Sequence, residues 1–337
     1  MKKIIIFCIL AVTANSFASD SGYHIIKRLK VGGEGGWDYL AVDEAARRLY
    51  ISRSAHVMVI DLDSDKVVGD IPDTQGVHGI ALAPELNRGF TSNGKADTST
   101  IFDLKTLKVI GSVKTGGNPD AIIYDPASKK VFTFNGRNKD TTIFDAATGK
   151  IEHTIPLGGK PEYAATDGKG KVYVNNEDTN EVIEISSLNK YTLRKFPLKS
   201  CEEPAGMGLD AKRDIVFSGC HNKTMTVLDA KTGKVITTLP IGANVDGNGF
   251  DAGTGLAFSS NGDGTLTIAH EVSPGNYEVL DTIVTQKGSR TMAVDPQTHN
   301  VYLPAAQFTS PKEPAQAGTK LRPVMVKGSF EILVVGK

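Results

Sequence analysis

The sequence has 337 residues, of which 40% are hydrophobic and 23% charged, and its 38 basic residues equal its 38 acidic residues in number. A chain of this length and composition can bury a substantial core, and its length alone would suggest one or two domains. Its near-neutral charge offers no general basic surface for a phosphate backbone, which makes nucleic acid an unexpected partner without excluding a local patch.

The N-terminus has the features of a secretory signal peptide. Lys2 and Lys3 precede an apolar run over residues 4–12, and Ser16-Phe17-Ala18 supplies the small residues of a cleavage site. Residues 1–18 are therefore predicted to be a signal peptide, which is too short to span a bilayer. The mature protein is predicted to be periplasmic or secreted, with no membrane span.

Residues 19–337 are predicted to form a single domain, because one pattern recurs seven times at intervals of 40 to 44 residues. Each copy has a turn, a short apolar strand that ends near an aspartate or its substitute, and a second strand. This period, with strands and no helical pattern, predicts a closed array of β-meanders. The anchor positions that align the copies are Asp43, Ala83, Asp125, Asp167, Asp210, Asp251 and Asp295.

The third copy shows the full pattern of four strands. Apolar strands are expected over residues 121–124 and 131–134, a third strand over 141–144, and a more polar outer strand over 150–157. Each copy therefore predicts one four-stranded blade.

The two ends of the chain complement each other, because the last copy offers strands only over residues 291–294, 301–303 and 330–335. Residues 23–31 resemble an outer strand that has no copy before it. We expect them to complete the last blade and close the ring, which removes exposed sheet edges. The sequence thus predicts an all-β, seven-bladed β-propeller of four-stranded meander blades, in which the N-terminal strand joins the C-terminal blade.

The last copy also carries a loop insertion over residues 307–328, with Pro311, Pro314 and Pro323. Proline there prevents ladder pairing and predicts an ordered or semi-rigid loop. The loop could cover the mouth of the propeller as a lid or be a surface elaboration.

Charged residues converge at one offset of the repeat. In a propeller, the turns before the inner strands lie on one face, around the central channel. Five residues before each anchor, six of the seven positions can carry charge. These positions are Asp38, His78, Asp120, Glu162, Ala205, Asp246 and Arg290.

The turns after the second strands should reach the same face. They contribute Arg53, Asn93, Arg137, Asn175 and Asn261 to a predicted oxygen-rich rim. Carboxylates crowded around a channel either have raised pKa values or hold a cation. Calcium or magnesium would suit such ligands, with Asp38, Asp120, Glu162 and Asp246 as the candidate set. Alternatively, these residues only satisfy backbone donors in turns.

His78 and Arg290 are the candidate catalytic residues. His78 could act as a general base beside carboxylates that orient it, or it could be a satisfied channel histidine. Arg290 could balance the charge of neighbouring carboxylates or receive an anionic ligand.

Cys201 and Cys220 remain after removal of the signal peptide, in a compartment where disulfides persist. Cys201 lies in the turn before the fifth inner strand and Cys220 in the turn after the next strand. We predict a structural disulfide between them rather than a redox site, because no Cys-x-x-Cys spacing occurs.

The repeat resembles the YVTN-repeat or YncE-like propellers of bacterial envelopes over essentially the whole mature chain. The matching phrases are Val59-Ile60-Asp61, Thr148-Gly149-Lys150, Val172-Tyr173-Val174-Asn175 and Thr232-Gly233-Lys234-Val235. A YncE-like subgroup shares Gly76-Val77-His78-Gly79, Asn118-Pro119-Asp120, Gly159-Lys160-Pro161-Glu162 and Arg290-Thr291-Met292. The resemblance implies the fold and an envelope location, while the architecture serves binding proteins, scaffolds and enzymes.

Three functions follow as hypotheses. The leading one is an exported, monomeric binding protein or scaffold that takes a small ligand, a metal ion or an envelope protein partner at the charged rim. The second is a metal-dependent lactonase-like hydrolase or lyase, in which a cation polarises a carbonyl and His78 moves the proton. The third, single-stranded DNA binding, is implied by the YncE resemblance, but the near-neutral charge and scattered aromatic residues argue against it.

Overall fold

The computed structural model describes residues 21–309 and 323–337. The predicted signal peptide, residues 1–18, lies outside the described residues, as does most of the proline-containing loop. Within the described part of the chain, no helix is long and apolar enough to cross a bilayer.

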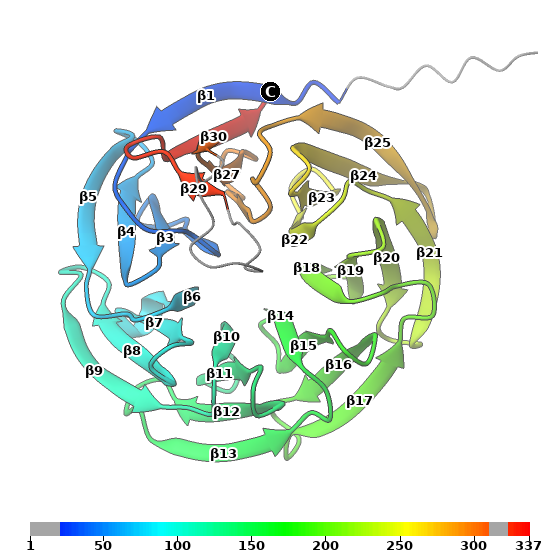
Figure 1. Ribbon diagram of the computed structural model, residues 1–337. Helices are drawn as coiled ribbons and strands as arrows, with labels where there is room; N and C mark the ends of the chain where they lie inside the picture. Colours follow the sequence, from blue (N-terminus) through cyan, green and yellow to red (C-terminus); the bar gives the residue numbers. More distant parts are fainter. Residues whose placement is uncertain (1–20, 310–322) are drawn as a thin grey trace, which may run out of the picture.

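Seven four-stranded antiparallel sheets surround a central channel, and in each of the first six blades the strands follow one another outward (Figure 1). Blades 1 to 3 contain β2 (Leu40–Asp43), β3 (Arg48–Arg53), β4 (His56–Asp61), β5 (Lys66–Ile71), β6 (Val77–Ala83), β7 (Arg88–Asn93), β8 (Thr98–Asp103), β9 (Val109–Lys114), β10 (Pro119–Asp125), β11 (Lys130–Asn135), β12 (Asp140–Asp145) and β13 (Ile151–Pro156). Blades 4 to 6 contain β14 (Pro161–Thr166), β15 (Lys171–Asn176), β16 (Glu181–Ser186), β17 (Thr192–Pro197), β18 (Pro204–Asp210), β19 (Ile215–Cys220), β20 (Thr224–Asp229), β21 (Lys234–Pro240), β22 (Val245–Asp251), β23 (Leu256–Asn261), β24 (Thr265–Ser273) and β25 (Asn276–Val284). The predicted seven-bladed propeller is confirmed.

The seventh blade joins the two ends of the chain. Its strands, from the channel outward, are β26 (Ala293–Val294), β27 (Val301–Ala305), β30 (Glu331–Gly336) and β1 (His24–Lys30). β1 pairs antiparallel with β30, as predicted from the orphan strand at the N-terminus. Arg47 of blade 1 adds a second link, because its guanidinium donates to both carboxylate oxygens of the buried Asp295 of blade 7, at 3.0 and 2.8 Å.

The recurring aspartates hold the turns between the first and second strands. Asp125 Oδ2 accepts hydrogen bonds from the backbone N–H and the hydroxyl of Ser128, which fixes a tight turn. The same type of contact to a following backbone N–H is made by Asp43, Asp167, Asp210, Asp251 and Asp295. At Ala83 a short 3₁₀ helix, η1 (Pro84–Leu86), makes the turn instead. The repeat is therefore visible in the sequence because these turns need a short acceptor side chain.

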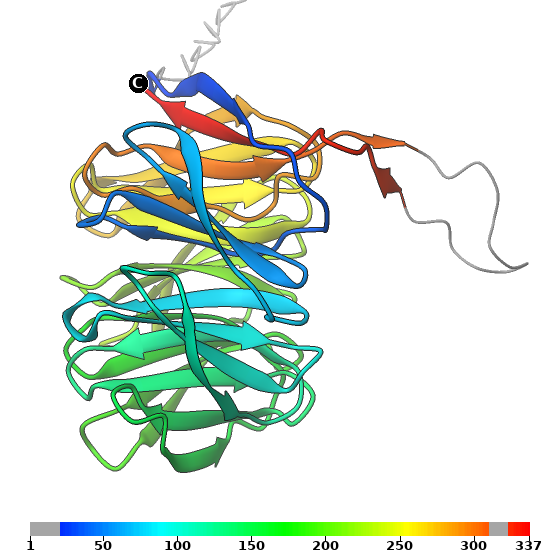
Figure 2. The same cartoon turned by 90° about the vertical axis from the view of Figure 1, so that its left-hand side faces the viewer.

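A small hairpin projects from one face of the ring (Figure 2). β28 (Phe308–Thr309) pairs with β29 (Val324–Met325), so the base of the predicted loop insertion forms a ladder that the prolines did not suggest. The ring of Trp37 lies 5.9 Å from that of Phe308 and 5.3 Å from that of Phe330. These aromatic contacts place the hairpin base on the face where the chain enters β2.

Candidate functional site

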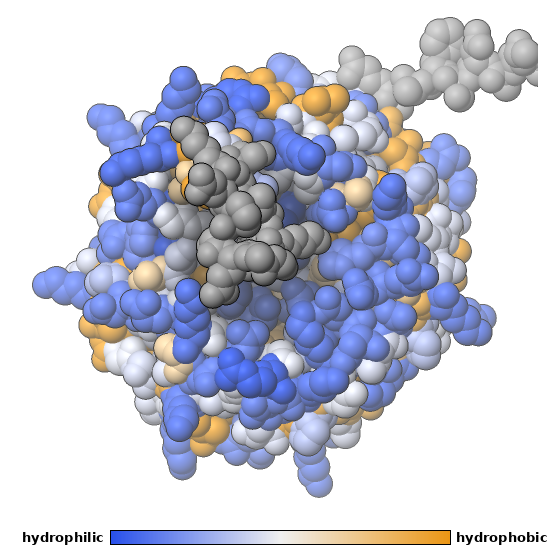
Figure 3. All heavy atoms as spheres, viewed as in Figure 1, coloured by the Kyte–Doolittle hydropathy of each residue, from blue (hydrophilic) through white to orange (hydrophobic). Residues whose placement is uncertain are grey.

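The six charged residues at the predicted offset gather at one mouth of the channel, where the innermost strands begin. We call them the charged ring: Asp38, His78, Asp120, Glu162, Asp246 and Arg290. Figure 3 shows mainly hydrophilic residues around the centre of this face. The seventh position is Ala205, which is buried and leaves a neutral gap between blades 4 and 6.

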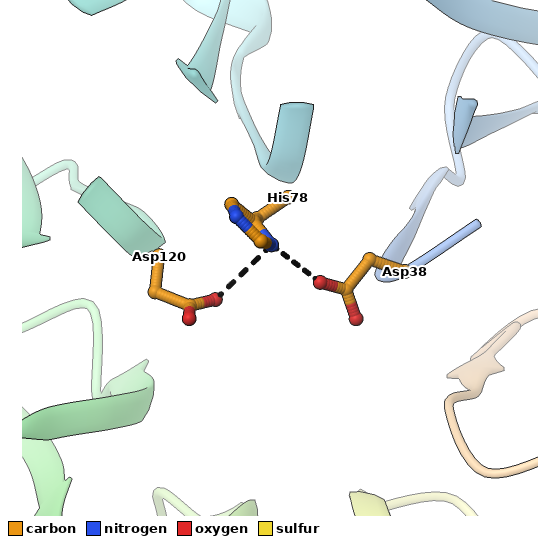
Figure 4. Close-up of side chains that lie close together, drawn as sticks. All are labelled: Asp38, His78 and Asp120. Carbon is orange, nitrogen blue, oxygen red and sulfur yellow. Dashed lines mark hydrogen bonds and ion pairs between the residues drawn. The ribbon is translucent and has the colours of Figure 1, made fainter. Parts of the chain in front are cut away.

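His78 bridges two carboxylates within the ring (Figure 4). Its Nδ1 lies 2.6 Å from Oδ2 of Asp38 and 3.6 Å from Oδ1 of Asp120. Burial alone would lower the pKa of His78, but the hydrogen bond to Asp38 and the negative charge of Asp120 outweigh it and raise the pKa to about 9. His78 is therefore an imidazolium at neutral pH.

Gly94 makes room for this arrangement. A Cβ atom at Gly94 would lie 2.7 Å from Nε2 of His78, closer than side-chain carbons come in proteins. The glycine after β7 thus allows the imidazole to lie between blades 1 and 3.

Three other ring carboxyl groups are disfavoured as anions. Burial raises the pKa of Asp120, and repulsion from Glu162 adds to this effect, bringing it to about 8. Burial also raises the pKa of Glu162 and that of Asp246 to about 7, although Lys160 and Arg290 respectively oppose the shift. Some of these groups retain protons near pH 7 when no external positive charge is present.

The remaining cations of the mouth are already paired. Lys160 Nζ lies 3.0 Å from Oε2 of Glu162 and also pairs with Glu177, and Arg290 Nε lies 3.0 Å from Oδ2 of Asp246. Of the two predicted readings of Arg290, the contacts favour charge balance. Counting Lys160 and Glu177 with the ring, five carboxylates face three cationic side chains, a formal excess of two negative charges.

Two tyrosines that sequence reasoning missed lie beside the charged ring. Tyr39 and Tyr163 follow Asp38 and Glu162 directly, and their rings meet edge to face at 4.8 Å. Burial and the charges of Asp120 and Glu162 raise the pKa of Tyr39 well above its ordinary value. Sequence reasoning could have found this pair only by comparing the position after each ring residue, because the other blades carry small or non-aromatic residues there.

Further along the channel the walls become apolar. Tyr163 also borders two cavities of about 330 and 190 Å³, which share Leu40, Ala41, Ile123 and Ala164. The mouth and the interior of the channel therefore offer different chemistry, with ionisable groups at the mouth and aliphatic side chains beyond the tyrosine pair.

Two arginines predicted for the rim lie outside the charged ring. Arg53 is fully buried, donates to the backbone carbonyls of Gly32, Glu34 and Gly35, and stacks over the ring of Phe330 at 3.6 Å. Its side chain therefore anchors the segment before β2. Arg137 is exposed and pairs with Asp97 at 3.3 Å, which links blades 2 and 3.

The three predicted rim asparagines are also buried within the blades. Asn261 Nδ2 donates to the hydroxyls of Thr265 and Thr267, and its Oδ1 accepts from Ser259. Asn93 makes the equivalent contacts with Thr91, Thr98 and Thr100, whereas Asn175 donates to the carbonyls of Ala205 and Gly206. These amides are fully satisfied by the protein, so they brace strand ends and offer no ligand atoms to the channel.

Cys201 and Cys220 form a disulfide in the structure, with their Cα atoms 5.4 Å apart. It joins two turns of blade 5 on the face of the charged ring. His221 follows Cys220, and its Nδ1 lies 3.0 Å from Oε2 of Glu203. The disulfide therefore lies next to a second, more exposed pair of a histidine and a carboxylate, His221 and Glu203.

The metal-ligand geometry of the mouth differs from the predicted carboxylate set. The ligand atoms of Asp38, His78 and Asp120 lie within 4.8 Å of one another, as do those of Glu177, Glu203 and His221. In the first group a metal would have to replace the proton on His78. Glu162 and Asp246 belong to neither group and pair with Lys160 and Arg290 instead, so the described structure does not bring the four predicted ligands Asp38, Asp120, Glu162 and Asp246 together.

Comparison with known proteins supports the fold alone. No protein family matches the sequence, and no curated protein resembles it detectably. Among solved structures, one described as the structure of U3-55K superposes with a TM-score of 0.72 over 94% of this chain and 99% of that chain, at 8% sequence identity. As many as 1732 solved chains match, so the likeness establishes a common architecture and no particular activity.

Proposed function

We propose that this protein is an exported propeller that binds a small cationic ligand at the charged ring. The observation that carries the proposal is the formal excess of two negative charges at a mouth whose carboxylate side chains are mostly buried. A bound cation would offset the repulsion between Asp120, Glu162 and Asp246 and stabilise their ionised forms. The ring then serves as a preformed site on a rigid scaffold.

Export is the second part of the proposal. It is supported by the signal-like features of residues 1–18, by the disulfide between Cys201 and Cys220, and by the resemblance to YncE-like propellers of bacterial envelopes. A disulfide of this kind persists in an oxidising compartment such as the periplasm.

The proposal is tested on the purified mature protein by measuring thermal unfolding with calcium, magnesium or n-butylammonium chloride, against sodium chloride at equal ionic strength. We expect at least one of these cations to raise Tm, because it binds the native state only. The rise should be lost in Asp120→Asn and Glu162→Gln and retained in Asp63→Asn, which changes an exposed carboxylate in the turn after β4. If none of these cations moves Tm in the wild-type protein, the ring does not bind cations.

A second candidate is the metal-dependent hydrolase or lyase. It is favoured by one observation, the approach of ligand atoms from Asp38, His78 and Asp120 to within 4.8 Å. A divalent metal bound there would polarise a carbonyl oxygen. Without it, His78 is protonated at neutral pH and suits the role of a proton donor better than that of a base. Single-stranded DNA binding is the weakest candidate, because the ring carboxylates would repel phosphates.

A further inference from the structure

Asp120 is a mostly buried carboxylate whose one side-chain contact among the described residues is the ion pair with His78. The residue is only 9% exposed, and its side chain points into the ring (Figure 4). No side chain or backbone group of the described residues donates a hydrogen bond to its carboxylate. The nearest cationic atom is Nδ1 of His78 at 3.6 Å, and this atom is engaged with Asp38 at 2.6 Å. A buried carboxylate without a donor is costly, so a ligand that supplies one would be favoured.

Glu162, the ring residue of the next blade, also lacks a well-placed hydrogen-bond donor. Oε2 of Glu162 is buried and has no partner in hydrogen-bond geometry, although Lys160 Nζ lies 3.0 Å away. Asp120 and Glu162 are the second residues of β10 and β14, the innermost strands of neighbouring blades, and these two strands pack against each other. Two acceptors from neighbouring blades thus lack well-placed donors.

The tyrosine pair gives this site an aromatic side. Tyr39 directly follows Asp38 and Tyr163 directly follows Glu162, and the centroids of the two rings lie 4.8 Å apart in an edge-to-face contact. Aromatic rings next to carboxylates bind organic ammonium groups, since the π-electrons attract the cation and the carboxylates accept its N–H donors.

A bare metal ion fits this arrangement less well. Calcium takes six to eight oxygen ligands at about 2.3–2.6 Å, which requires carboxylates to converge on one point. Here Glu162 and Asp246 are held by Lys160 and Arg290 on opposite sides of the Ala205 gap. An ammonium group needs only two or three acceptors, which Asp120 and Glu162 supply without giving up these ion pairs.

We propose that the ligand of the charged ring is an aliphatic primary amine whose ammonium group lies between Asp120 and Glu162, next to Tyr39 and Tyr163. This inference rests on the proposed function, namely that the ring binds a cation. It adds the chemical class of that cation, an aliphatic primary amine, and the place of its ammonium group beside Tyr39 and Tyr163.

Isothermal titration of the mature protein with n-butylamine at pH 8 tests the proposal, with calcium chloride, tetramethylammonium chloride and n-butanol as comparison ligands. We expect n-butylammonium to bind more tightly than tetramethylammonium, which lacks N–H donors, and n-butanol, which lacks charge. Asp120→Asn and Glu162→Gln should each weaken n-butylamine binding at least about tenfold, whereas Asp63→Asn should leave it unchanged. Circular dichroism and Tm confirm that each variant is folded.

The possible failures are distinguishable. Calcium binding at the ring without n-butylamine binding would overturn the amine assignment and leave the proposed function standing. Equal affinity for tetramethylammonium would overturn the role of the carboxylates as hydrogen-bond acceptors. Absence of binding by every cation would overturn both proposals, and unchanged n-butylamine affinity in both ring variants would place the amine elsewhere.

Discussion

The charge of His78 determines the electrostatics of the mouth. As an imidazolium it offsets the negative charge of Asp38 and favours the ionised form of Asp120, and it contacts both through one nitrogen, Nδ1. Its hydrogen bond to Asp38 is the principal contact that opposes the burial of the charged ring nitrogen. The protonation of His78 therefore depends on a residue contributed by the preceding blade.

We expect Asp38→Asn to lower the pKa of His78 by at least about one unit from its raised value near 9, because burial then acts with less opposition. The imidazole proton signals of His78, followed by NMR through a pH titration, measure this change. Asp63→Asn should leave the pKa of His78 unchanged. A wild-type His78 that titrates near the ordinary value of about 6.5 would contradict the bridging geometry.

The residues of the charged ring were predictable from the sequence, but the tyrosines and the lysine beside them were not. Repeat alignment places Asp38, His78 and Asp120 at equivalent positions, and equivalent positions in a closed ring must converge. The tyrosines and Lys160 belong to single blades, so no sevenfold pattern reveals them. Sequence alignment also cannot tell whether Asn261 faces the channel or its own blade, since both directions are open to a residue at a strand end.

The asparagines at the ends of second strands stabilise individual blades. In both Asn261 and Asn93, Nδ2 donates to threonine hydroxyls of the next strand, while Oδ1 accepts from a hydroxyl of the asparagine's own strand. Such contacts replace backbone pairing at the point where the strands separate into a turn.

Asn261→Ala should therefore lower the free energy of unfolding by about 2–3 kcal/mol, because it leaves buried hydroxyls of Ser259 and Thr267 unpaired. Asn222→Ala, at an exposed position in the turn of blade 5, should change it by less than about 0.5 kcal/mol. Urea denaturation measures both. A stable Asn261→Ala protein that has lost cation binding would restore the predicted role of Asn261 at the rim.

The strand pattern of the blades was predictable because short apolar strands bounded by turn residues recur in every copy. The base of the hairpin in the last blade was not, since β28 and β29 contain two residues each and lie outside the repeat. Their position depends on the contact of Phe308 with Trp37, which comes from the opposite end of the chain.

For the whole molecule, the charged mouth makes stability depend on pH. The carboxyl groups of Asp120, Glu162 and Asp246 have raised pKa values, so the native state binds more protons than the unfolded chain above about pH 4. His78 also has a raised pKa, and its contribution is present below about pH 6.5 and lost as the pH rises through about 9. All four pKa shifts therefore make the native state less stable as the pH rises.

We therefore expect Tm, measured without added ligand, to fall by more than about 5 °C between pH 5 and pH 9. Differential scanning calorimetry across this range measures the trend. Replacing both Asp120 and Glu162 by their amides should flatten it, and the single variant Asp63→Asn should not. Stability that increases with pH over this range would show that the ring carboxyl groups titrate normally.

The pairing of β1 with β30 has a consequence for the order in which the protein matures. The first strand to be synthesised can take up its place only after residues 331–336 have been made, some 300 positions later. Until then the nascent ring stays open at one blade, with an unsatisfied edge that other chains could pair with. A stop codon that removes the last strand should thus leave six complete blades and a seventh with only two of its four strands, so that the ring cannot close. Protection by chaperones is then most needed at the very end of synthesis.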